Sequence, residues 1–310
     1  MEQRAAEHRT GVIFGFSAYL LWGLFPLYFP LLEPASPVEI LAHRVIWSLI
    51  AVVAVLAVGR NVGSLIALMR DRRRALMLVV AAILIAANWG VFIYAVNSDH
   101  VIEGSLGYFI TPLVSAAFGV LFFREHLRQR QLLALGLGAC AVAVLTVDYG
   151  RVPWIAVTLA LSFACYGLIK KVVDVGAAES LAVETLVLLV PALGYVFVIE
   201  GSGSGTFTGS SLGHVVLLVL LGPVTAIPLL LFSGAVTRIP LSVVGLLQYT
   251  TPTLQFLIGV TVAGEHMPTS RWIGFALVWL ALMVLSADAL RAAQRSRAEA
   301  RAAEPDLVPT

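Results

Sequence analysis

Two stretches of the chain, ITPLVSAAFGVLFFREH at residues 110–126 and TTPTLQFLIGVTVAGEH at residues 250–266, share residues at a constant spacing of 140. Both contain Thr-Pro, then Gly, then Glu-His at the same distances. The same shift aligns Glu39 with Glu179 and Ala42 with Ala182. Apolar coincidences are common in membrane proteins, but matched polar and helix-breaking residues are hard to obtain by chance. The pattern therefore predicts an internal repeat.

The composition places the chain in a lipid bilayer. Of its 310 residues 59% are hydrophobic and 12% are charged, about half the charge of an ordinary soluble domain. Many apolar runs approach the roughly 20 residues that a helix needs to span a membrane. Continuous apolar runs exclude a β-barrel, whose strands alternate. Cys140 and Cys165 lie inside apolar runs, which argues against disulfides.

We expect an all-α membrane protein with ten transmembrane helices. The first has no cleavage site after it, so we interpret it as retained rather than as a signal peptide. The expected spans are residues 11–32, 38–59, 75–96, 101–123, 131–147, 152–169, 181–199, 213–236, 241–263 and 271–290.

The cations indicate the orientation of these spans. The tails and every second connection hold seventeen of the twenty Lys and Arg residues, whereas the opposite connections hold only Arg151 and Arg271. The positive-inside rule then puts both termini in the cytoplasm. The seventeen are Arg4, Arg9, Arg60, Arg70, Arg72, Arg73, Arg74, Arg124, Arg128, Arg130, Lys170, Lys171, Arg238, Arg291, Arg295, Arg297 and Arg301.

The repeat divides the chain into two halves, residues 11–147 and 152–290, between a cytoplasmic N-terminal tail (1–10) and a C-terminal tail (291–310) that we expect to be disordered after a short helical extension. Five spans in each half mean that the second half enters the membrane from the other side. Such 5+5 inverted repeats are typical of secondary transporters, with the substrate at the repeat interface near the midplane. The architecture thus predicts transport of a small molecule.

Polar residues at helical spacing are candidates for the lining of a substrate cavity. The glycines among them favour close helix packing instead, and Trp22 and Tyr166 near span ends favour interfacial anchoring. For the bulkier residues, cavity lining and packing are both open. The candidates are Asn88, Trp89, Tyr108, Thr111, Gln248, Tyr249, Thr251 and Gln255.

Two prolines occupy matching repeat positions inside spans. Pro112 and Pro252 each remove a backbone hydrogen bond, which predicts either a static kink or a hinge. Interrupted segments at corresponding places mark binding sites in transporters.

Charged residues inside spans are costly and are therefore functional candidates. Arg44 lies about 10 Å inside the second span at 1.5 Å per residue, and Glu103 lies near the same boundary. We expect an ion pair between Arg44 and Glu103, with a structural, substrate-binding or gating role left open. Glu184 near Lys170 suggests a second pair at the inner end, although snorkelling lysines explain the position as well. Glu103 and Glu184 are candidates for protonation.

Motifs for other functions are absent from the sequence. It contains no H-E-x-x-H, G-x-S-x-G or P-loop pattern and no cluster of His and Cys, so we expect no enzyme, metal or cofactor. No basic patch is interleaved with aromatic residues, which argues against nucleic acid as a partner. The lipid bilayer and a small-molecule substrate are the expected partners, and a homo-oligomer is left open.

Several segments resemble the RarD-type permeases of the EamA branch of the drug/metabolite transporter superfamily. They are SAYLLWGLFPLYF (17–29), EILAHRVIWS (39–48), NWGVFIYAVN (88–97), EGSLGYFITPL (103–113) and QYTTPTLQFL (248–257). The resemblance implies a ten-helix inner-membrane permease with cytoplasmic termini and a chloramphenicol-related label. The family's Gly-Glu pair is kept at Gly264-Glu265 but is Arg124-Glu125 in the first half. The resemblance and the repeat together predict alternating access; a scaffold or regulatory protein and a channel are the alternatives.

Overall fold

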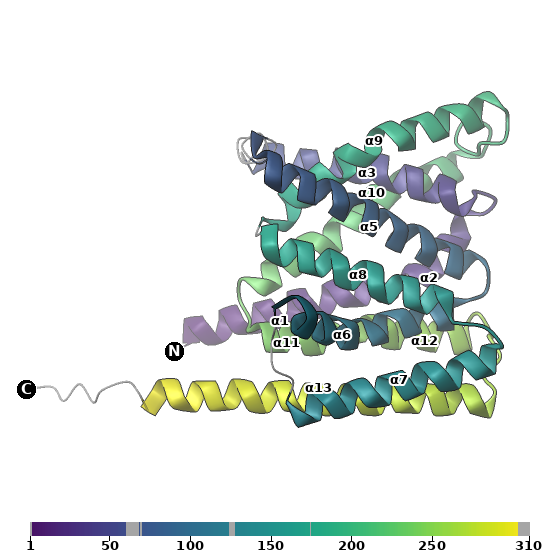
Figure 1. The fold of residues 1–310 in the computed structure, drawn as a ribbon. Coiled ribbons are helices and arrows are strands. Elements are labelled where there is room, and N and C mark those ends of the chain that lie inside the picture. The colour runs from purple at the N-terminus through teal and green to yellow at the C-terminus, as the bar shows by residue number, and fades with distance from the viewer. Residues whose placement is uncertain (1, 60–67, 69, 124–127, 174, 303–310) are drawn as a thin grey trace, which may run out of the picture.

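The computed structural model describes residues 2–59, 68, 70–123, 128–173 and 175–302. Every regular element among them is a helix, and the long helices run side by side through the molecule (Figure 1). The helices are α1 (Glu2–Gly23), α2 (Phe25–Tyr28), the 3-10 helix η1 (Phe29–Leu32), α3 (Pro37–Val58), α5 (Arg72–Asn97), α6 (Val101–Phe123), α7 (Gln129–Tyr149), α8 (Trp154–Val173), α9 (Ala177–Gly201), α10 (Leu212–Val236), α11 (Leu241–Leu247), α12 (Thr250–Thr261) and α13 (Thr269–Ala302).

The helix lengths confirm an all-α membrane fold. Nine helical segments of the described residues are long and apolar enough to span a bilayer, and a bent pair, Ala6–Gly23 with Phe25–Leu32, brings the number to as many as ten. This pair is bent by 41°. The ninth expected span is divided into α11 and α12 but still passes as one segment, Val243–Thr261.

Helical structure extends into both expected tails. Helix α1 begins at Glu2, inside the expected N-terminal tail, and α13 continues to Ala302, well into the C-terminal segment that we expected to be disordered. The composition favours this, because Ala, Glu, Gln and Arg are strong helix formers. Residues 303–310 lie outside the described residues, as do Glu125 and His126 of the repeat.

Polar caps define where several spans begin. The Ser36 hydroxyl accepts from the Glu39 N–H at 3.2 Å, just before Pro37 opens α3. Asp71 accepts from the first backbone N–H groups of α5, and Ser211 caps α10. Such side chains satisfy N–H groups that have no partner within the helix. These caps mark the first residues of α3, α5 and α10.

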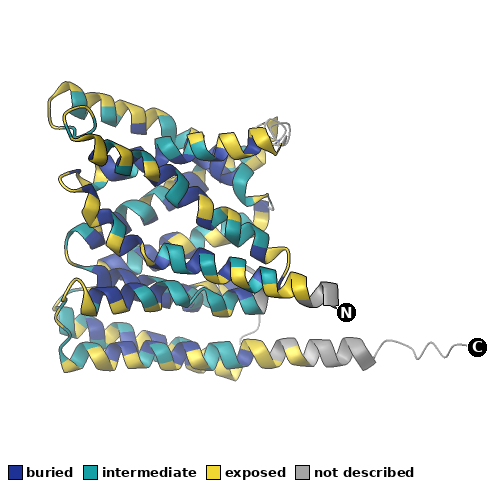
Figure 2. Cartoon of the chain, turned by 180° about the vertical axis from the view of Figure 1, so that it is seen from behind, coloured by how far each residue is buried: buried dark blue, intermediate teal, exposed yellow. Residues whose placement is uncertain are grey.

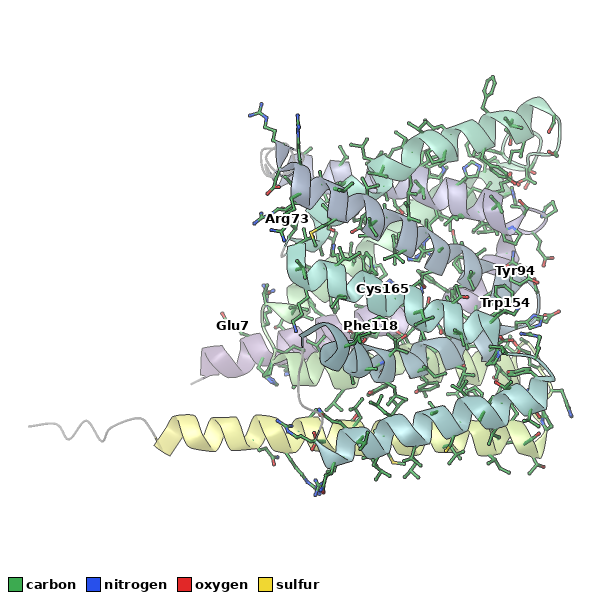
Figure 3. All side chains as sticks on the ribbon, viewed as in Figure 1. Glu7, Arg73, Tyr94, Phe118, Trp154 and Cys165 are labelled. Atoms are coloured by element: carbon green, nitrogen blue, oxygen red, sulfur yellow. The ribbon has the colours of Figure 1, made fainter. Side chains whose placement is uncertain are left out.

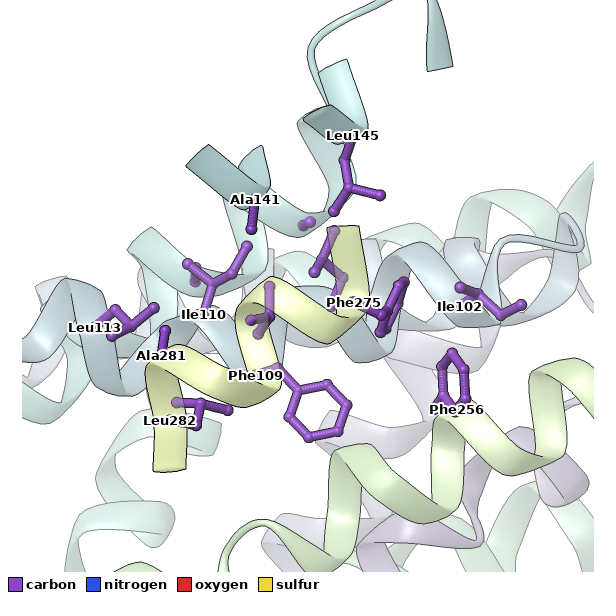
Figure 4. Packing of buried hydrophobic residues seen from close by; sticks show 14 of the residues in the cluster. Ile102, Phe109, Ile110, Leu113, Ala141, Leu145, Phe256, Phe275, Ala281 and Leu282 are labelled. Atoms are coloured by element: carbon purple, nitrogen blue, oxygen red, sulfur yellow. The ribbon is translucent and has the colours of Figure 1, made fainter. Parts of the chain in front are cut away.

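Helices α7 and α13 pack against each other at one edge of the molecule (Figure 1). Their contact belongs to a core shared with α6 and α12, in which Phe109, Leu145, Phe256 and Phe275 meet (Figure 4). Phe256 and Phe275 have ring centroids 4.7 Å apart. Aromatic packing of this kind stabilises the edge beyond simple area burial.

Large apolar side chains cover the outside of the bundle, where exposed positions recur along the helices (Figure 2). Val147 is 83% exposed, Phe197 81% and Val190 77%. In water such a surface would aggregate, whereas in lipid it is the expected exterior. The exposed apolar surface therefore agrees with the apolar helices in indicating a bilayer.

Both termini lie at one end of the bundle, and Tyr94 and Trp154 lie near the other end (Figures 1 and 3). The two rings are 5.7 Å apart, in positions typical of an interfacial aromatic anchor. Between the ends, α3 packs on α9 and α10, α6 packs on α8 and α12, and α1 packs on α10 and α12. Contacts between the first and second halves of the chain therefore form the centre of the molecule.

Candidate functional site

Arg44 lies in the interior of the molecule on α3 and is 3% exposed. Its guanidinium carbon is 4.0 Å from the centre of the Trp89 ring, 5.0 Å from Phe25 and 6.0 Å from Phe29. Its Nε donates to the Thr225 hydroxyl at 3.0 Å. We name these five residues the arginine cluster. It joins α2, η1, α3 and α5 of the first half to α10 of the second.

The predicted ion pair between Arg44 and Glu103 is not formed. Glu103 instead pairs with Arg151, with 2.8 Å between Oε2 and Nη2, and accepts from the Ile155 N–H at 3.1 Å. The reason is helix packing. Helix α6 packs on α8, which brings Glu103 to the connection that holds Arg151, whereas α3 packs on α9 and α10.

Asn88 and Tyr108, both predicted cavity residues, contact each other. The Tyr108 hydroxyl donates to Asn88 Oδ1 at 3.0 Å, and Asn88 Nδ2 donates to Ser162 Oγ at 3.0 Å and to the Leu159 carbonyl at 3.1 Å. Both ends of the amide are thus engaged. The network connects α5, α6 and α8.

A continuous line of rings joins this amide network to the arginine cluster. Phe29 and Phe92 are 6.2 Å apart, and Phe92 and Tyr108 are 5.4 Å apart. The centre of the molecule therefore combines one cation, an amide and a set of aromatic faces. These are the kinds of group that recognise an organic molecule with a polar end and an apolar body, although here they are buried and the two pockets described below are lined by other residues.

The polar residues of the ninth span are divided between two places. Thr251 Oγ1 donates to the Tyr19 carbonyl at 2.7 Å, and Gln255 Nε2 donates to the Trp22 carbonyl at 3.4 Å. These contacts attach α12 to α1. Gln255 is 1% exposed, and its Oε1 has no hydrogen bond within the described residues.

Gln248 and Tyr249 lie at the break between α11 and α12, away from the arginine cluster. With Ser286 and Leu290 they line a pocket of about 300 Å³ beside α13. Thr111 also stays apart, because its hydroxyl donates to the Gly107 carbonyl of its own helix at 2.9 Å. The structure therefore does not gather all the predicted cavity residues in one place.

The two prolines have different surroundings. Pro112 lies inside the unbroken helix α6, whereas Pro252 follows the break at Gln248 and Tyr249 in the first turn of α12. At the start of a helix a proline removes no needed hydrogen bond. The equivalence of the two prolines as hinges stays a prediction.

Glu184 on α9 is 1% exposed and accepts hydrogen bonds from three residues. Ser180 Oγ donates at 2.6 Å, the Tyr166 hydroxyl at 3.1 Å and Lys170 Nζ at 3.3 Å. Lys170 is therefore paired with Glu184, which the snorkelling interpretation did not require. Tyr166 belongs to this pair rather than to a lipid-facing anchor.

A polar pocket of about 470 Å³ lies at the end of the bundle away from the termini, and sequence reasoning missed it. Arg271 Nε donates to Asp148 at 3.0 Å beside the Glu103 and Arg151 pair. Arg151 and Arg271 of this pocket are the only Lys or Arg residues in the connections opposite the cation-rich side, and this was the signal available in the sequence. The lining residues are Asp99, His100, Glu103, Tyr149, Arg151, Ala263, Gly264, Glu265, His266 and Arg271.

Glu265 in this pocket joins the two halves of the chain. Its carboxylate accepts from the backbone N–H groups of Val101 and of Ile102, the latter at 3.2 Å, at the start of α6. Burial raises the pKa of Glu265 to about 7, although these two hydrogen bonds favour the charged form. The Arg151 pKa is raised by its hydrogen bond to Glu103.

The connection between α9 and α10 is anchored on α3. Thr206 donates from N at 2.7 Å and from its hydroxyl at 2.8 Å to Glu39. The Phe207 ring stacks on His43 with centroids 4.9 Å apart. Composition alone could not reveal these contacts, because the residues that hold the loop lie far away in the sequence.

Comparison with known proteins relates the chain to transporters. The sequence model of the EamA-like transporter family matches residues 9–147. Protein RarD of Streptomyces exfoliatus is 52% identical over 304 residues, covering 98% of this chain and 96% of that protein. Protein RarD of Escherichia coli (strain K12) is 40% identical over 292 residues, covering 94% of this chain and 99% of that protein.

Two further similarities are more distant. The chloramphenicol-sensitive protein RarD of Pseudomonas aeruginosa is 28% identical and covers 91% of this chain and 95% of its own length. A crystal structure of a protein that is 18% identical superposes with a TM-score of 0.53, over 88% of this chain and 96% of that one. The latter similarity supports the fold alone.

Proposed function

We propose that this chain carries a small organic molecule across the cell inner membrane by alternating access. The premise is that the chain belongs to the EamA-like transporter family and to its RarD-type permeases. The substrate would bind at the arginine cluster and the adjoining amide network. Both lie between helices of the two halves, where inverted-repeat transporters bind their substrates.

The single observation that carries this proposal is the burial of Arg44 among aromatic rings at the centre of a multi-pass bundle. Intramembrane charges are expensive and typically mark a substrate or ion pathway. The aromatic faces around it suit the apolar body of a metabolite or a drug-like molecule. The name chloramphenicol-sensitive protein, which a distant relative carries, is compatible with a substrate of this size but does not define it.

The packing of the helices supports the proposed inverted repeat. In the proposed repeat α1 corresponds to α8, α5 to α10 and α6 to α12. The contact of α6 with α8 then corresponds to that of α12 with α1, and the contact of α5 with α8 corresponds to that of α10 with α1. Both members of each pair occur. The family match also stops at residue 147, at the expected end of the first half. Two similar halves of opposite orientation can exchange conformations, which would open the site to each side in turn.

The proposed orientation has both termini in the cytoplasm. They lie at the same end of the bundle (Figure 1), and the sequence places seventeen cations in the tails and connections of that side. The polar pocket with Arg151 and Arg271 would then face the outside.

Counterflow in proteoliposomes tests the proposed function. Purified full-length protein is reconstituted with unlabelled candidates inside, and uptake of the same labelled candidate is measured for wild type, Arg44→Ala and Tyr108→Ala. We expect wild type to exchange the labelled candidate, and the exchange rate to fall about tenfold or more in both variants. A change of this size corresponds to the loss of at least one charge-assisted or polar contact. Arg130→Ala, at an exposed position of α7, is the matched control and should keep wild-type exchange. No exchange by wild type across a broad panel would contradict the proposal.

A further inference from the structure

Arg44 has an incomplete set of partners. Within the described part of the chain it takes part in none of the ion pairs, and its guanidinium makes a single hydrogen bond, from Nε to Thr225. The rings of Trp89, Phe25 and Phe29 lie over the guanidinium. A guanidinium has further N–H donors in a planar fork at its two terminal nitrogens, and these rings offer no lone pair to them.

Such an arrangement is costly for a purely structural residue. A buried charge is usually paired, because desolvation outweighs what neighbouring rings return through cation–π attraction. Glu103 and Glu184 illustrate the rule, since Glu103 pairs with Arg151 and Glu184 pairs with Lys170, whereas the buried Glu39 is held by hydrogen bonds from Thr206. Arg44 departs from it although it is equally buried. Among the described residues, the ion pairs therefore leave Arg44 without the counter-charge that Glu103 and Glu184 have.

We propose that Arg44 is the substrate's counter-charge and that the natural substrate is an amphiphilic organic carboxylate. This inference rests on the proposed transport function. The terminal N–H groups of the fork match the two oxygens of a carboxylate. The apolar body of the substrate would lie along Trp89 and Phe29 and extend toward Tyr108. Because the cluster supplies one cation, a monoanion balances it, whereas a phosphate dianion would leave a negative charge unpaired.

The surroundings also explain how such a substrate could be released. Thr225, which accepts from Arg44, belongs to α10 of the second half, and the rings belong to the first half. Movement of the halves relative to each other would change the number of contacts that hold the guanidinium. An anion bound to the guanidinium would then be held by a different number of contacts in each conformation.

Matched pairs of ligands that differ only in charge test the inference. Full-length protein in detergent is titrated at neutral pH with 4-phenylbutyrate and 4-phenylbutyramide, and with indole-3-acetate and indole-3-acetamide, while thermal stabilisation is recorded. We expect at least one acid to bind wild type about tenfold or more tightly than its amide, a ratio that corresponds to one charge-assisted contact. In Arg44→Met the acid and the amide should bind within about twofold of each other.

Two further variants keep the test decisive. Arg44→Lys retains the charge but loses the fork, so it should keep a preference for the acid with affinity reduced about tenfold; it replaces Arg44→Met if that variant does not fold. Arg128→Met removes an exposed cation that pairs with Asp288 away from the cluster, and it should bind both ligands as wild type does.

Equal binding of acid and amide by wild type, a preference for the acid that survives in Arg44→Met, or no stabilisation by either acid would each overturn the inference. Its failure is separable from failure of the proposed function. Counterflow of neutral amides that exceeds counterflow of acids would leave transport standing and reject the anionic substrate. The absence of exchange of any compound would reject transport itself.

Discussion

The Arg44 guanidinium carbon lies 4.0 Å from the centre of the Trp89 ring, in a part of the molecule where Arg44 is 3% exposed. A cation on an indole face away from water gains about 2 kcal/mol or more. The two side chains come from neighbouring helices, Arg44 from α3 and Trp89 from α5, and no sequence motif links them. Their contact fixes the direction of the fork at the centre of the bundle.

Replacement of Trp89 should weaken this arrangement in a graded way. Trp89→Leu should lower the free energy of unfolding by about 2 kcal/mol through loss of the cation–π contact alone, with an added packing cost. Trp89→Phe keeps a smaller aromatic face and should lose less. Thermal unfolding of the detergent-solubilised protein measures both. Equal effects of Leu and Phe would contradict a role for the ring's electrostatics.

The hydrogen bond from Tyr108 to Asn88 predicts coupling between these residues. Tyr108→Phe removes the donor to Asn88 Oδ1 and should cost about 1 kcal/mol of stability. Asn88→Ala removes the bonds to Ser162 and Leu159 as well, so it should cost more. In a double-mutant cycle the combined variant should lose less than the sum of the single losses. Additive losses would mean that the bond contributes nothing.

The pair of Glu103 with Arg151 is asymmetric, because the Glu103 side chain is 1% exposed and that of Arg151 is 39% exposed. Arg151→Ala should therefore destabilise the protein by about 1–3 kcal/mol, the cost of a buried acceptor that loses its partner. Adding Glu103→Gln to Arg151→Ala should restore part of the loss, since the remaining group is then neutral. A double variant that is less stable than Arg151→Ala would contradict this account.

Glu265 predicts a pH dependence of stability. Burial raises its pKa from 4.5 to about 7 in the folded protein, so the folded state holds this proton more tightly than the unfolded state does. The contribution of Glu265 to stability is thus fully present below about pH 4.5, falls as the pH rises to about 7 and is flat above that.

The matching measurement is the melting temperature of wild type and Glu265→Gln between acidic and mildly basic pH. Gln keeps a carbonyl acceptor for the Val101 and Ile102 N–H groups but does not titrate. Relative to wild type it should gain stability as the pH rises from about 5 to about 8. Glu33→Gln, which removes an exposed carboxylate, controls for net charge. A difference between wild type and Glu265→Gln that does not change with pH would refute the prediction.

The spans could be predicted from sequence because lipid demands long apolar helices. Expected span 213–236 is α10 (Leu212–Val236), and expected span 101–123 is α6 (Val101–Phe123). The burial of Arg44 could also be predicted from its depth in the second span. The ends of the helices in the tails could not, because apolar patterning does not report a helix that continues beyond its apolar part, as α13 does after Arg291.

The partners of the charged residues were harder to predict, because they depend on which helices are neighbours. Arg44 and Glu103 lie near the same predicted end of their spans, but α3 packs on α9 and α10 whereas α6 packs on α8. Arg151 and Arg271 stood out as rare cations of their side, yet their pocket required the fold. The contact of Phe207 with His43 likewise joins residues whose spacing carries no periodic signal.

Accessibility of position 108 from both sides of the membrane tests alternating access most directly. In a background of Cys140→Ser and Cys165→Ser, Tyr108→Cys is exposed to a membrane-impermeant maleimide from outside intact cells and from outside inverted vesicles. Alternating access predicts labelling from each side. Labelling from one side only, or from neither, would contradict the proposed mechanism.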